Sequence, residues 1–209
     1  MFNSIPDGST IKFEKTNKFY GLTKGINLLA RNNLTIESNG ATIKFLDGVD
    51  DVFMNNFPHE FANDSIFKLF NCNCIKINNL TLDGNILNRI PFSEHESQNS
   101  NIFLMSSHNV TITNCNLING MTDGICLFRS ESSENNKSNK NIVIDNCYFD
   151  SNRRNNISII DGNNVKLVNC ELINAGKIKG TLPMGNICIE SDNAYLKYPV
   201  KDVFIDNCI

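Results

Sequence analysis

Residues Asn109–Cys115 read NVTITNC, and the same phrase returns with variations along the chain. Its clearest further copies are NIVIDNC at 141–147, NVKLVNC at 164–170 and DVFIDNC at 202–208. Weaker copies are NLTIESN at 33–39 and CIKINNL at 74–80. Because a unit of this kind buries its apolar face only against its neighbours, the repeat predicts an architecture of stacked units.

Each repeat contains two more short apolar segments, one on either side of the phrase. The preceding segments lie at 66–70, 102–106, 125–129, 157–161 and 187–191, and the following ones at 80–85, 116–120, 148–152 and 171–175. Inside them apolar, often β-branched, residues alternate with polar ones, as Val110 and Ile112 do. A period of two predicts strands. A unit of about 20–30 residues with three short strands in one sense predicts a coil of a parallel β-helix.

Two residue types recur at fixed places in the phrase and predict its corner. Asparagine can adopt the left-handed backbone that a sharp corner needs, and stacked Asn amides can bond one another as a ladder. Cysteines that follow the corner suit a column of small, buried, free thiols better than a disulfide framework. The Asn positions are 79, 114, 146, 169 and 207, and the cysteines are Cys115, Cys147, Cys170 and Cys208.

Composition narrows the class of protein. The chain has 209 residues with a net charge of -3, so no basic surface argues for nucleic acid. No apolar run approaches the ~18 residues that a membrane span needs. The N-terminus shows no signal-peptide pattern. Free cysteines fit a reducing interior or a phage particle, and the sequence leaves the localisation open.

The repeats run through the whole length, so we predict one β-helix domain over residues 1–209. Polar stretches near 47–64, 86–100 and 129–140 are predicted insertions that leave the coil at its corners. Ile209 follows an Asn-Cys corner directly, in the middle of a coil. We therefore expect the chain to be an incomplete fragment.

The repeats resemble those of a known superfamily. The segments DSNRRNNISIIDGNNVKLVNCEL (150–172) and GTLPMGNICIES (180–191) are similar to coils of the pectate-lyase-like superfamily. The resemblance implies an all-β fold, a single-stranded right-handed parallel β-helix with three short strands per coil, an Asn ladder and an inward Cys column. It implies less about activity, because this fold carries many functions.

The densest group of ionisable residues belongs to the later coils. Aligning Ile125, Ile157 and Ile187 places Phe128, Ile160 and Glu190 in one column, with Arg129, Asp161 and Ser191 beside it. Stacked coils are ~4.8 Å apart, so carboxylates two coils apart lie within ~10 Å, as in an inverting glycosidase. We predict catalytic roles for Asp123, Asp161 and Glu190, and substrate-binding roles for Arg129, Asp150, Arg153 and Arg154.

Each of these assignments has a competing structural interpretation. The stretch TDG at 122–124 resembles the NTDG motif of polygalacturonases, but Met121 replaces its Asn and the other motifs are missing. Asp123 is therefore either a site residue or a turn residue. Arg153 and Arg154 either neutralise a uronate carboxylate or form an exposed pair with Asp150. Glu190 is a general acid if buried and ordinary surface if exposed.

Two classes of function remain open at this stage. The first is an enzyme that hydrolyses, eliminates or epimerises an acidic polysaccharide, with the predicted residues converging on one groove. The second is a non-catalytic structural or glycan-binding β-helix, such as part of a phage tail spike or adhesin, in which outward Phe103, Phe128 and Ile160 form an exposed stripe that suits a homotrimer. No cofactor is predicted, and the scattered acidic residues Asp145, Asp150 and Asp161 give calcium no clear motif.

Overall fold

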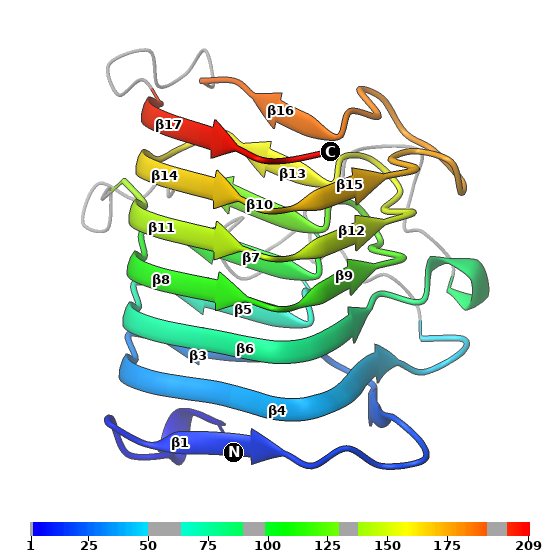
Figure 1. The fold of residues 1–209 in the computed structure, drawn as a ribbon. Coiled ribbons are helices and arrows are strands. Elements are labelled where there is room, and N and C mark those ends of the chain that lie inside the picture. Colours follow the sequence, from blue (N-terminus) through cyan, green and yellow to red (C-terminus); the bar gives the residue numbers. More distant parts are fainter. Residues whose placement is uncertain (1, 50–63, 90–98, 130–137, 192–199) are drawn as a thin grey trace, which may run out of the picture.

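The computed structural model describes residues 2–49, 64–89, 99–129, 138–191 and 200–209. The chain winds in stacked coils, with its strands lying one above another from β1 at one end to β16 and β17 at the other (Figure 1). Most of the predicted insertion at 47–64, and parts of those at 86–100 and 129–140, lie outside the described residues. None of the helices in the described part is long and apolar enough to cross a membrane.

The described strands form two sheets, and all of their pairings are parallel. The eleven-stranded sheet contains β1 (Thr10–Phe13), β2 (Tyr20–Leu22), β4 (Asn32–Phe45), β6 (Asn73–Asp83), β8 (His108–Thr113), β9 (Asn116–Ile118), β11 (Lys140–Asp145), β12 (Tyr148–Asp150), β14 (Asn163–Val168), β15 (Glu171–Ile173) and β17 (Lys201–Asp206). The six-stranded sheet contains β3 (Ile26–Leu29), β5 (Phe67–Phe70), β7 (Ile102–Met105), β10 (Ile125–Phe128), β13 (Ile157–Ile159) and β16 (Ile187–Ile189). Two 3-10 helices, η1 (Phe2–Ser4) and η2 (Ile86–Asn88), complete the described elements.

The predicted register is confirmed. Ile125 pairs with Ile102 on one side and with Ile157 on the other, and Ile157 pairs in turn with Ile187. On the opposite sheet, Ile112 and Ile144 pair in the same way. Successive side chains of a strand point to opposite faces, so these columns all enter one interior. Leu104, Val110, Ile112, Ile125 and Ile157 are fully buried there.

The corner of the coil also follows the prediction. Asn114, Asn146 and Asn169 have φ angles of 55°, 52° and 53°, in the left-handed region that Asn tolerates better than most residues. The Asn146 amide donates to Asn114 Oδ1 at 2.7 Å, whereas Asn169 donates to Asp145 Oδ1 at 2.8 Å. The Asn ladder is therefore confirmed, with one variation. The amide of Asn169 bonds to the carboxylate of Asp145, the residue before Asn146, instead of to Asn146 itself.

A second Asn ladder stands at the other end of the phrase, which the sequence did not lead us to predict. The amides of Asn109, Asn141 and Asn164 each donate to the Asn of the preceding coil, beginning at Asn73, at 2.8–2.9 Å. The three donors have φ angles of 54–58°. Both ends of the strand that carries the phrase are thus fixed by side-chain bonds between coils.

The cysteine column is confirmed inside the core. Cys115, Cys147 and Cys170 are at most 3% exposed, and their thiols donate weakly to backbone carbonyls such as Ile77 O and Ile112 O. All eight cysteines are free thiols. Contacts with Cys115 and Cys170, together with burial, raise the pKa of Cys147.

The prediction of an exposed apolar stripe is wrong. Phe103 is fully buried, and Phe128 and Ile160 are partly buried against it. These side chains form a second apolar cluster on the outer face of the six-stranded sheet, together with Phe70, Met105 and Cys126. The sequence pattern identified the outward direction correctly, but alternation within a strand says nothing about what covers the outer face. The stripe consequently gives no support to a homotrimer.

Candidate functional site

The outer face of the six-stranded sheet carries polar side chains at its later coils. Cys126, Ser158 and Cys188 are register partners on β10, β13 and β16, and they point away from the core. Asp123 and Arg154 precede β10 and β13, and Glu190 follows β16. The repeat therefore brings residues from three coils to one face.

Arg154 lies between two carboxylates on this face. Its Nη1 is 3.7 Å from Asp123 Oδ2, and its Nη2 is 3.9 Å from Glu190 Oε1. The three side chains differ sharply in exposure, which is 2% for Asp123, 9% for Arg154 and 54% for Glu190. The group thus runs from a buried acid through a buried guanidinium to an accessible acid. The predicted convergence holds for these three residues.

Asn155 organises the base of the group, although the sequence did not point to it. Its backbone N–H donates to Asp123 Oδ1 at 3.0 Å, and its side-chain amide donates to Ser158 Oγ at 2.9 Å. Its amide oxygen accepts the Gly185 N–H at 2.8 Å. Asp123 therefore fixes the turn before β13 as well as facing Arg154, and its predicted role as a site residue stays a prediction.

The turn that carries Asp123 requires close packing between coils. A Cβ atom at Gly124 would lie 2.6 Å from Asn156 O, so only glycine fits there. Asn152 supports the same turn, since its amide oxygen accepts the Gly120 N–H at 2.8 Å and its nitrogen donates to Asn156 Oδ1 at 2.8 Å. A pair of asparagines directly before a strand, such as Asn155 and Asn156 before β13, is the sequence feature that could have predicted these turn contacts.

Arg153 contacts the segment between β15 and β16. Its Nε donates to Lys179 O at 3.0 Å, and its own carbonyl accepts the Thr181 N–H at 3.1 Å. Arg154 Nε donates to Leu182 O at 3.4 Å. Arg153 and Arg154 are 4% and 8% exposed, so the interpretation of an exposed ion pair is wrong.

The segment 176–186, between β15 and β16, forms a pocket beside Arg153. The pocket is open, has a volume of about 630 Å³, and is lined by Arg153, Lys179, Gly180, Thr181 and Leu182. The Lys179 ammonium reaches back to η2, where it donates to Ile86 O at 2.9 Å, Leu87 O at 3.4 Å and Arg89 O at 3.1 Å. This contact ties the segment to a coil far earlier in the chain.

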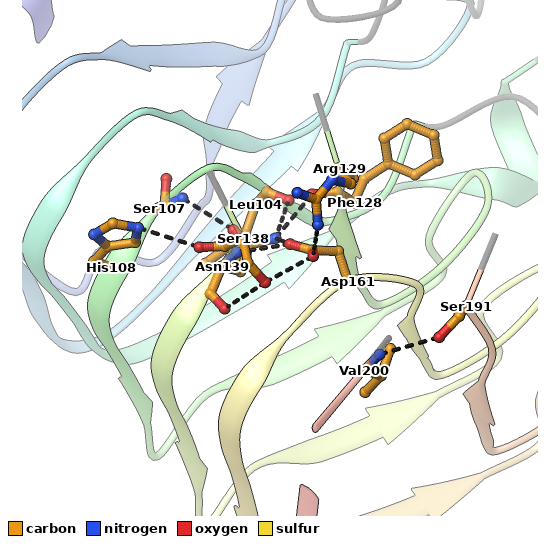
Figure 2. Close-up of polar contacts among 10 residues, drawn as sticks. All are labelled: Leu104, Ser107, His108, Phe128, Arg129, Ser138, Asn139, Asp161, Ser191 and Val200. Carbon is orange, nitrogen blue, oxygen red and sulfur yellow. Dashed lines mark hydrogen bonds and ion pairs between the residues drawn. The ribbon is translucent and has the colours of Figure 1, made fainter. Parts of the chain in front are cut away.

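Arg129 and Asp161 form a separate buried group (Figure 2). Arg129 Nη1 donates to Asp161 Oδ1 at 3.0 Å, and Ser138 Oγ donates to the same oxygen at 2.7 Å. The Asn139 backbone N–H and amide donate to Asp161 Oδ2 at 2.6 and 3.2 Å. Burial raises the pKa of Asp161, against the opposing effect of these bonds. Asp161 is 1% exposed, and its hydrogen bonds come from Arg129, Ser138 and Asn139 rather than from the Arg154 group, so the predicted convergence fails for Arg129 and Asp161.

Asp150 belongs to neither group. It ends β12, and its carboxylate accepts from Asn174 Nδ2 and Ser151 Oγ at 2.8 Å and from the Tyr148 hydroxyl at 3.2 Å. Partial burial raises its pKa, but the hydrogen bonds from Asn174, Ser151 and Tyr148 outweigh that effect and lower it. Within the described ranges, no group of three or more His, Cys, Asp or Glu side chains could hold a metal ion.

Comparison with solved structures agrees with this architecture. A protein of Parabacteroides merdae provisionally assigned as a glycosyl hydrolase superimposes with a TM-score of 0.61 at 16% identity, over 97% of this chain and 82% of that one. The pre-mature gene product 12 of bacteriophage phi29 gives 0.59 at 20% identity, over 76% of this chain and 21% of that one. The A-module of a mannuronan C-5 epimerase of Azotobacter vinelandii gives 0.59 at 14% identity, over 95% and 54%.

Sequence comparison adds no family assignment. No protein-family model matches the chain, and no curated protein matches it. At identities of 14–20%, the structural likeness establishes the fold alone. The chain is therefore a right-handed parallel β-helix protein, as the resemblance of its repeats implied.

Proposed function

We propose that this protein binds and processes an acidic polysaccharide on the outer face of β10, β13 and β16. In this proposal Arg154 binds the carboxylate of a uronate residue. Glu190 is exposed, so it is not the buried general acid considered from the sequence, and we assign it the role of general base. The observation that carries the proposal is the position of Arg154, 3.7 Å from the buried Asp123 and 3.9 Å from the exposed Glu190, at the boundary between the covered outer face of β10 and β13 and the solvent. A substrate carboxylate can bind a guanidinium through two parallel hydrogen bonds, which makes Arg154 the candidate group for recognising a uronate.

The exposure of the two acids gives them different roles. Glu190 is half exposed and can reach a bound sugar, whereas Asp123 is 2% exposed and is held by Arg154 and Asn155. Asp123 therefore serves to hold the guanidinium, and Glu190 is the group available for proton transfer.

The burial of Asp123 limits the chemistry. A retaining glycosidase needs two carboxyl groups that both reach the sugar, and Asp123 is 2% exposed, so hydrolysis with retention does not fit these two acids. In an elimination, Glu190 removes the proton next to the uronate carboxylate while the bond to the departing sugar oxygen breaks and that oxygen takes a proton from water. In an epimerisation, water returns a proton to the opposite face of the ring instead. In both reactions Arg154 stabilises the charge that develops on the carboxylate. The likeness to a mannuronan C-5 epimerase module supports an acidic polysaccharide as the substrate class.

Product formation on a panel of acidic and neutral polysaccharides tests the proposal. Reducing-end release reports hydrolysis, ultraviolet absorbance of an unsaturated sugar reports elimination, and a changed NMR spectrum at constant chain length reports epimerisation. We expect turnover of an acidic polymer to be lost in Glu190→Gln and in Arg154→Ala. The matched control is Glu171→Gln, which changes an exposed acid on β15.

The same experiment separates the enzyme from a non-catalytic alternative. A fold likeness to a phage protein accompanies the likeness to carbohydrate-active proteins. Binding of acidic polymer without any product, in the wild type as in Glu190→Gln, would replace the enzyme with a glycan-binding β-helix.

A further inference from the structure

Two consecutive arginines serve two neighbouring surfaces. Arg154 extends to Asp123 and Glu190, whereas Arg153 extends to the segment 176–186 and lines its pocket. Leu182 joins the two surfaces, because its carbonyl accepts from Arg154 Nε and the same residue lines the pocket. The pocket therefore adjoins the proposed site at Leu182.

The pocket has the size and chemistry of a sugar subsite. Its volume of about 630 Å³ lies in the range of small-ligand sites, and its lining combines a guanidinium, the Thr181 residue and the apolar Leu182. A guanidinium recognises a planar carboxylate, and apolar groups suit the C–H face of a pyranose ring.

Lys179 holds this lining in place. Its ammonium donates to the carbonyls of Ile86, Leu87 and Arg89, and its own carbonyl accepts from Arg153 Nε. One lysine thus connects η2, the segment 176–186 and Arg153. Removing the ammonium would release the segment from η2, so the Lys179 carbonyl that accepts from Arg153 Nε would no longer be held in place.

We propose that the pocket lined by Arg153, Thr181 and Leu182 is a second uronate subsite, and that Lys179 is its positioning residue. This inference rests on the proposed function, because it extends the substrate from the Arg154 site into the pocket. A uronate polymer that crosses Leu182 would place one acidic sugar at Arg154 and another at Arg153.

Calorimetric titration with uronate oligosaccharides of increasing length tests the subsite without depending on turnover. We expect affinity to rise at least tenfold between oligomers that fill one site and oligomers that reach both. Lys179→Met and Thr181→Val should remove most of that gain and leave the affinity of the shortest binding oligomer unchanged. Lys179→Arg, which retains a cation, should keep part of it. Lys177→Met is the matched control, because Lys177 is exposed and its ammonium donates to Asn174, outside the pocket.

The outcomes separate the two proposals. If short oligomers bind through Arg154 but affinity does not rise with length, or if Lys179→Met and Thr181→Val leave the rise intact, the subsite is wrong and the proposed function stands. If no uronate oligomer binds, both are wrong. Thermal unfolding of each variant, expected to stay near the wild type for Thr181→Val, shows whether a loss of affinity reflects loss of the fold.

Discussion

The guanidinium of Arg154 lies 3.7 Å from the carboxylate of Asp123, and both side chains are more than nine-tenths buried. They come from neighbouring coils, so the pair depends on the stacking of β10 and β13. Glu190 approaches the same guanidinium from the solvent side. Because Asp123 and Arg154 are buried and Glu190 is exposed, substitutions can distinguish a contribution to stability from a contribution to ligand binding.

Arg154→Ala is expected to destabilise the protein, whereas Glu190→Gln is not. Loss of Arg154 leaves Asp123 as a buried carboxylate without its cation, which costs about 2–4 kcal/mol. Glu190 is largely exposed, so its replacement changes the free energy of unfolding by less than about 0.5 kcal/mol. Urea denaturation measures both. Adding Asp123→Asn to Arg154→Ala should restore part of the lost stability; a strictly additive double variant would contradict the pairing.

Asp161→Ala is expected to destabilise the protein by about 3 kcal/mol, because the buried donors of Arg129, Ser138 and Asn139 would lose their acceptor. Burial raises the pKa of Asp161 above 3.8, so the folded protein holds that proton more tightly than the unfolded chain does. The stability that this group contributes is therefore full below pH 3.8 and declines as the pH rises through its raised pKa.

Urea unfolding between pH 4 and 7 tests the sign. The wild-type curve should contain a declining contribution that is missing from Asp161→Asn. Asp145→Asn is the matched control: Asp145 accepts from Asn169 at 2.8 Å, and an amide oxygen can accept the same bond. Equal pH profiles for the wild type and Asp161→Asn would contradict the assignment.

Asn141→Ala is expected to cost about 1–3 kcal/mol, because Asn141 donates to Asn109, accepts from Asn164 and has a φ of 56°. Asn141→Gly loses the same two bonds but suits the left-handed backbone, so it should cost less than Asn141→Ala. Thermal or urea unfolding ranks the two variants. The reverse order would mean that the corner does not depend on backbone conformation.

The thiols should divide into two classes in the native protein. Cys74, Cys188 and Cys208 are partly exposed, whereas the other five are buried. Burial raises the pKa of Cys72 to about 11 and that of Cys126 well above its ordinary value, which slows alkylation further. Mass spectrometry after brief alkylation should find label on the exposed class alone until denaturant is added. Early labelling of Cys147 would contradict the packed column.

The repeat made the architecture predictable from sequence. The spacing of Ile125, Ile157 and Ile187 determines the register, because one alignment of the coils places every apolar residue inside. The register also predicts Glu190 in the column next to that of Asp161. It does not predict that the Asp161 carboxylate accepts four hydrogen bonds from Arg129, Ser138 and Asn139, while Glu190 lies near Arg154.

The rest of the site lies in irregular segments, which no period describes. The bond from Lys179 to Ile86 joins residues 93 positions apart, and nothing local to either residue encodes it. Asn155 was overlooked for a related reason, because its backbone N–H rather than its side chain holds Asp123. The sequence pattern also does not show whether the outer face of the six-stranded sheet is covered. It predicts Phe103 at the surface, and Phe103 is fully buried.

Recognition of the uronate charge by Arg154 is measured by comparing the affinity for one oligouronate with that for its carboxyl-reduced, neutral counterpart. Both ligands have the same length, linkage and ring shape, so only the charge differs. We expect the wild type to bind the acidic ligand about 10–100-fold more tightly, and Arg154→Ala to lose this preference. Equal affinity for the two ligands in the wild type, or an undiminished preference in Arg154→Ala, would contradict the proposal.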